Sequence, residues 1–189
     1  MLNGCELSSE ECKQYRAAIL DVLSTKRSDL TKREDSIRQK LSDRNKKAEE
    51  YLLDEKTFID EHMEETVQFL IMQGICKSQG EELSAILSSK VKYRKYSKHK
   101  GFSMGLYELT VGNAERGSFY KRVPKDKYGK LEYLFREDGR LVSIIYYSSE
   151  SYHNICCVLY SKSYIYYMVF EQLCGNKTLY GIKILKNLN

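Results

Sequence analysis

The chain has 189 residues, of which 42% are hydrophobic and 30% charged, a balance typical of a globular rather than a disordered protein. The formal net charge of +5 is unevenly distributed, because residues 1–89 hold 13 basic and 18 acidic side chains whereas residues 90–189 hold 18 and 8. No apolar run reaches the roughly 18 residues needed to cross a bilayer, and the first residues lack the features of a signal peptide. We therefore expect a cytoplasmic protein with a helical segment over 1–89 and a basic, tyrosine-rich β domain over 90–189.

An eleven-residue apolar repeat dominates the first half of the chain. Its residues are spaced alternately by seven and four, with no Gly or Pro between Gly4 and Gly74, so one narrow stripe can follow a nearly straight helix. A capping box at Ser8 and Glu11, and a cap at residue 28 or 29, predict helices over about 9–25, 29–73 and 81–89. The stripe consists of Leu30, Ile37, Leu41, Ala48, Leu52, Ile59, Met63 and Leu70.

This stripe is too long for the first helix to cover. In an antiparallel hairpin, a helix of about 16 residues spans about 24 Å, whereas one of about 45 residues spans about 67 Å. The uncovered part predicts a homodimer, because two-fold pairing is the commonest association of soluble chains. The alternatives are a monomer whose β domain covers the stripe and a coiled-coil structural or adaptor protein. The predicted interface residues are Leu41, Ala48, Leu52 and Ile59.

After residue 90 the apolar period changes from 3.6 to 2, which predicts strands. Glu137-Asp138-Gly139 and Cys174-Gly175-Asn176 are typical of tight hairpin turns. The predicted strands cover 91–96, 103–111, 117–123, 130–136, 140–148, 154–161, 163–171 and 178–185. We therefore expect an α+β protein, in which an N-terminal helical hairpin with one long helix precedes a mostly antiparallel β-meander or half-barrel. The best core candidates are Ile144, Ile145, Val158, Leu159, Val169, Ile182 and Ile184.

The sequence contains no recognisable catalytic motif. His153 and Cys157 would lie about 13 Å apart in a regular strand, too far for a base to activate a thiol. The six cysteines form no CxxC pair, and the three histidines do not supply zinc-ligand spacings. We therefore expect reduced structural cysteines and a non-enzymatic protein without catalytic residues, metal or cofactor.

The most distinctive polar segment is 90–100, in which six Lys/Arg alternate with two tyrosines. The cations suit phosphates and the rings suit bases, so the segment indicates nucleic-acid binding. The alternative is a sheet edge that lysines protect against strand pairing. In a strand, Lys92 and Arg94 would share one face while Tyr93 and Lys95 share the other. The candidate binding residues are Lys92, Tyr93, Arg94, Lys95, Tyr96, Lys98 and Lys100.

A second group of tyrosines falls within the later strands. These rings could form a binding patch on the sheet, since tyrosine suits interfaces, or could pack across neighbouring strands. The group consists of Tyr146, Tyr147, Tyr152, Tyr160, Tyr164, Tyr166 and Tyr167.

The stretch 128–147 reads Y-G-K-L-E-Y-L-F-R-E-D-G-R-L-V-S-I-I-Y-Y, a hairpin with aromatic flanks. It resembles the tandem-hairpin β-meanders of some bacterial immunity proteins, over about 20 of the 189 residues. The resemblance implies a protein that binds and neutralises a toxin. We therefore expect a bacterial or phage-type protein-interaction module, such as an immunity or antitoxin-like inhibitor, whose partner is a toxin or a second copy. A nucleic-acid-binding protein is the alternative.

Overall fold

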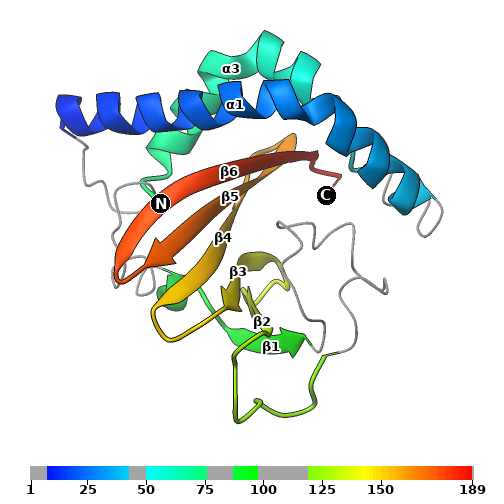
Figure 1. The fold of residues 1–189 in the computed structure, drawn as a ribbon, viewed down its shortest axis with the longest axis vertical. Helices are drawn as coiled ribbons and strands as arrows, with labels where there is room; N and C mark the ends of the chain where they lie inside the picture. Colours follow the sequence, from blue (N-terminus) through cyan, green and yellow to red (C-terminus); the bar gives the residue numbers. More distant parts are fainter. Residues whose placement is uncertain (1–7, 43–49, 76–86, 98–118, 189) are drawn as a thin grey trace.

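Two helices pack on one face of a curved six-stranded sheet (Figure 1). The computed structural model describes residues 8–42, 50–75, 87–97 and 119–188. Each strand pairs antiparallel with the next along the chain, and the sheet is not closed into a barrel, which confirms the predicted α+β class with a β-meander. The elements are α1 (Ser9–Ser42), α3 (Glu55–Met72), β1 (Tyr93–Ser97), β2 (Leu131–Phe135), β3 (Leu141–Tyr147), β4 (Tyr152–Tyr160), β5 (Tyr164–Leu173) and β6 (Asn176–Lys186).

Both predicted hairpin turns are present. Gly139, between β2 and β3, has a φ of 81°, and its N–H donates to the Arg136 carbonyl at 3.2 Å. Between β5 and β6, Cys174 and Gly175 have φ angles of 48° and 85°, the paired positive values that match the twist of adjoining strands. The predicted strand 103–111 lies outside the described residues. Of the predicted strand 117–123, only an isolated bridge between Phe119 and Ser97 is described.

Helix α1 continues through the boundary that the sequence predicts near residues 26–28. The Ser8–Glu11 capping box begins it, with the Glu11 N–H donating to Ser8 Oγ at 3.2 Å and the Ser8 N–H donating to Glu11 Oε2 at 3.0 Å. The helices predicted over 9–25 and 29–73 therefore have different bounds. A polar residue such as Ser28 or Asp29 inside a helix costs at most about 0.7 kcal/mol relative to Ala, too little to end α1.

The helical path is instead interrupted at residues 50–54. Asp54 caps α3 by accepting the Thr57 N–H at 3.2 Å and the Thr57 hydroxyl at 3.0 Å. Gly74, with a φ of 66°, follows the end of α3, as the sequence predicts. Of the helix predicted over 81–89, residues 87–89 are described and are helical. The apolar stripe is therefore not carried by one continuous helix.

Residues 51–55, at the break between the two helices, lie along the outer edge of β6. The Lys186 N–H donates to the Tyr51 carbonyl at 2.9 Å, and the Ile184 N–H donates to Glu55 Oε1 at 2.6 Å. These amides belong to alternate residues of the last strand, whose outer edge could otherwise pair with another chain. Residues 51–55 therefore protect this edge of the sheet.

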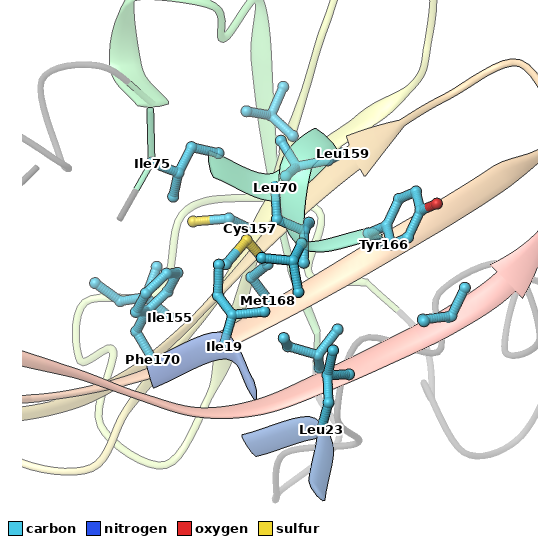
Figure 2. Close-up of a cluster of buried hydrophobic side chains, with 14 of the residues drawn as sticks. Ile19, Leu23, Leu70, Ile75, Ile155, Cys157, Leu159, Tyr166, Met168 and Phe170 are labelled. Atoms are coloured by element: carbon cyan, nitrogen blue, oxygen red, sulfur yellow. The ribbon is translucent and has the colours of Figure 1, made fainter. Parts of the chain in front are cut away.

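Each face of the sheet has its own apolar cluster. On the helix side, Ile19 and Leu23 of α1 and Leu70 of α3 meet sheet residues that include Cys157 and Met168 (Figure 2). The opposite cluster includes Cys156, so the two neighbouring cysteines point to opposite faces, as expected for a strand. Of the seven predicted core residues, six are buried and Ile145 is partly buried.

Candidate binding surface

Strand β1 ends the described sheet and brings two basic segments together. Phe119 bridges to Ser97, and the Tyr120 N–H donates to the Tyr96 carbonyl at 2.8 Å. Residues 121–130 then lead into β2, which pairs with the other side of β1 (Figure 1). We call these gathered cations the basic end: Lys92, Arg94, Lys95, Lys121, Arg122, Lys125, Lys127 and Lys130.

The loop 121–130 is the part of the basic end that the sequence analysis missed. It holds five Lys/Arg and one acidic residue, Asp126, which pairs with Lys130 at 3.8 Å. Lys121, Arg122 and Lys125 are exposed and form no ion pair with any residue that the structure describes. The segment K-R-V-P-K-D-K-Y-G-K is recognisably basic. Only the contact of residues 119–120 with β1 shows that it belongs to the same surface.

The basic residues of β1 alternate between the two faces, as expected. Arg94 lies opposite Leu134 on the helix-side face, and Tyr93 lies opposite Phe135 on the other face. Lys92 pairs with Glu137 at 3.4 Å, and its side chain remains 63% exposed. The predicted binding residues Lys98 and Lys100 lie outside the described residues.

On the face away from the helices, Lys95 lies among aromatic rings. Its Nζ is 5.6 Å from the ring centroid of Tyr93, 5.3 Å from that of Phe119 and 5.6 Å from that of Phe135. Tyr93 itself stacks on Phe135, with centroids 5.0 Å apart and ring planes 14° apart. Tyr93 is thus exposed but already has an aromatic partner.

On the helix-side face, a buried carboxylate organises the remaining residues of the basic end. Glu132 is completely buried in β2, and its Oε1 accepts hydrogen bonds from Tyr96 OH at 2.7 Å and from Arg94 Nη1 at 3.2 Å. Its Oε2 accepts from the Tyr147 hydroxyl and lies 3.9 Å from Lys127 Nζ. Four donor side chains therefore converge on one carboxylate, which we call the Glu132 cluster.

The tyrosines of the Glu132 cluster are held in their neutral form. Burial, followed by the hydrogen bond to Glu132 and its negative charge, raises the pKa of Tyr96 from 10.0 to about 12. The same causes, in the same order, raise the pKa of Tyr147. Tyr96 is only 5% exposed, so its ring is not available to a ligand.

These shifts predict that stability falls as the pH rises from about 10 to about 12. Below pH 10 the two tyrosines are protonated in both states; above it, the unfolded chain releases protons that folded Tyr96 retains. The unfolded state then binds fewer protons, so the free energy of unfolding decreases with pH. Urea denaturation across this range measures the slope. Tyr96→Phe should make the slope shallower, and an unchanged slope in this variant would contradict the assignment.

The predicted interface residues of the apolar stripe do not form one surface. Ile59 is completely buried in the cluster between the helices and the sheet, and Leu52 packs against the cluster on the opposite face. Ala48 and the side chain of Leu41 lie outside the described part of the structure. Two of the four side chains are thus packed inside the chain itself.

The second tyrosine group also divides between different environments. Tyr166 and Tyr167 are buried, and Tyr164 packs on Phe58 of α3 with ring centroids 4.5 Å apart. Tyr147 belongs to the Glu132 cluster. The remaining members are partly exposed on the face away from the helices: Tyr146, Tyr152 and Tyr160. Cross-strand packing therefore accounts for much of the group.

Among the residues described, no three or more His, Cys, Asp or Glu side chains are arranged to hold a metal ion. In the same part of the chain, Cys12, Cys156, Cys157 and Cys174 form no disulfide bond. Within the same residues, none of the helices has the length and apolar character needed to span a membrane.

Comparison with known proteins found no family model, no curated protein and no solved structure that matches the chain.

Proposed function

We propose that this chain is a non-enzymatic binding protein that recognises an acidic protein partner through its basic end. The observation that carries the proposal is the contact of residues 119–120 with β1, which brings the cations of two sequence segments to the same end of the sheet. A surface of one sign accelerates encounter with an oppositely charged partner. A toxin is the partner class implied by the hairpin resemblance of residues 128–147, and neutralisation by binding is then the biological role.

A protein partner is favoured over a nucleic acid by the state of the tyrosines. Base stacking needs exposed rings, yet Tyr96 is buried and Tyr93 stacks on Phe135. Nucleic acid is the second candidate, because the exposed cations Lys121, Arg122 and Lys125 could neutralise phosphates without stacking.

Charge reversal at the basic end tests the proposal. Lys121→Glu with Arg122→Glu should slow association with a labelled oligoglutamate peptide by about tenfold or more at low salt, because these exposed cations attract the probe. Stopped-flow fluorescence anisotropy measures the rate. The matched control is Lys162→Glu with Lys186→Glu, an equal charge change at exposed positions between β4 and β5 and at the end of β6, the strand at the opposite edge of the sheet from β1.

Three outcomes separate the candidates. Slower association in the first variant only supports an acidic protein partner. Tighter binding of a single-stranded oligothymidylate than of oligoglutamate, with a steep loss on adding salt, would favour the nucleic-acid candidate instead. Equal slowing by both variants would show that net charge rather than the basic end governs association.

A further inference from the structure

The Glu132 cluster presents two cations to solvent above a buried anion. The side chains of Arg94 and Lys127 are 46% and 39% exposed, whereas that of Glu132 is fully buried. Glu132 therefore contacts the buried side of both cations. Because Arg94 and Lys127 carry two positive charges and Glu132 one negative charge, the cluster has a net charge of one positive unit. A buried carboxylate needs such partners, since an unpaired one is strongly unfavourable in a protein interior.

The guanidinium of Arg94 has five N–H donors, more than its contacts with Glu132 and Tyr96 use. It donates to Glu132 through Nη1, the side chain is 46% exposed, and its other two nitrogens are Nε and Nη2. These two nitrogens form one planar edge, which matches the two oxygens of a carboxylate.

Lys127 lies near the other oxygen of the Glu132 carboxylate and over two aromatic rings. Its Nζ lies 5.4 Å from the ring centroids of both Tyr96 and Tyr147, the tyrosines whose hydroxyl groups bind Glu132. Arginine and lysine side chains normally lose rotamer freedom when they bind a ligand. Here both are restrained beforehand, which lowers that entropic cost.

We propose that Arg94 and Lys127 together bind one carboxylate group of the partner, with Glu132 as the positioning residue. The inference rests on the proposed function, because it assumes an acidic protein partner. The inference adds a defined contact at Arg94 and Lys127 to the general attraction that the positive charges of the basic end exert on the partner. The Nε–Nη2 edge of Arg94 forms two parallel hydrogen bonds to the carboxylate while the Lys127 ammonium supplies the second charge.

Equilibrium binding of an oligoglutamate peptide to the full chain tests this site. Arg94→Gln and Lys127→Gln should each weaken binding by about tenfold, since hydrogen bonds to charged groups are among the strongest. Lys92→Gln removes the same charge from the same end of the sheet but outside the Glu132 cluster, so it should weaken binding less than either of these variants. Lys162→Gln is the matched control, because it removes the same charge from an exposed position outside the basic end, and it should change affinity by less than about twofold. Because both cations bind one carboxylate group, the variant that combines Arg94→Gln and Lys127→Gln should lose less affinity than the product of the two single losses.

Two further variants make the result specific. Arg94→Lys keeps the charge beside Glu132 but lacks the planar edge, so it should bind nearly as weakly as Arg94→Gln. Glu132→Gln should weaken peptide binding although it increases the net positive charge, because the two cations lose their anchor. Circular dichroism confirms that each variant is folded before its affinity is interpreted.

The outcomes distinguish this inference from the proposed function. If the unaltered chain does not bind oligoglutamate, both are overturned. If Lys92→Gln weakens binding as much as Arg94→Gln, or if Arg94→Lys binds normally, the defined site is overturned while a diffuse basic surface stands. Preference for oligothymidylate would assign the same cations to phosphate and overturn the carboxylate site.

Discussion

Replacing Lys183 with methionine should lower the free energy of unfolding by about 3–5 kcal/mol. Lys183 Nζ lies 3.0 Å from Glu55 Oε2, the Glu55 side chain is fully buried, and the Lys183 side chain is 11% exposed. The substitution removes the ammonium group and leaves the carboxylate in the same interior. Since Glu55 also accepts the Ile184 N–H, the loss should weaken the attachment of α3 to the edge of β6. Chemical denaturation followed by circular dichroism measures the change.

Two variants show whether burial causes this effect. Lys13→Met makes the same substitution in an exposed pair, where Lys13 lies 3.6 Å from Glu10, and should cost less than about 0.5 kcal/mol. Combining Lys183→Met with Glu55→Gln should recover part of the lost stability, because the amide keeps an acceptor for Ile184 without a buried charge. Equal effects of Lys183→Met and Lys13→Met would contradict the argument.

The sheet could be predicted from sequence because its signals are local. Alternating apolar residues define the strands, and Asp138-Gly139 and Cys174-Gly175 supply the positive φ angles that the two hairpin turns require. The β-meander then follows from the short connections. The helix boundaries were harder to predict, because the favourable cap at Asp54 competes with an apolar repeat that continues on both sides of it.

The binding surface was less predictable because it depends on contacts between distant residues. Arg94 and Tyr96 meet Glu132, which is 38 and 36 residues away in sequence, and Tyr147 lies a further 15 residues along the chain. Sequence alone marks Tyr96 as an aromatic residue in a basic segment. Only the sheet register, which places Tyr96 opposite Glu132, shows that its ring is buried and that its hydroxyl is engaged.

Replacing Ile59 with alanine should lower the free energy of unfolding by about 2–5 kcal/mol. Ile59 is completely buried in the cluster that joins the helices to the sheet, so the substitution removes apolar contacts and leaves a cavity within one chain. The sequence instead placed Ile59 at an interface between two chains. The two placements of Ile59 predict different results. Truncating a residue at a dimer interface weakens association, whereas truncating a core residue destabilises the folded single chain.

Denaturation and light scattering together distinguish these positions. Met72→Ala is the control on the same helix; Met72 is 73% exposed, and its truncation should change stability by less than about 0.5 kcal/mol. We expect Ile59→Ala to unfold more readily at an unchanged molecular mass. An Ile59→Ala variant with normal stability but a smaller molecular mass in solution would show instead that Ile59 lies at an interface between chains. A homodimer that persists in Ile59→Ala would have to associate through another surface, since the Ile59 side chain packs against its own sheet.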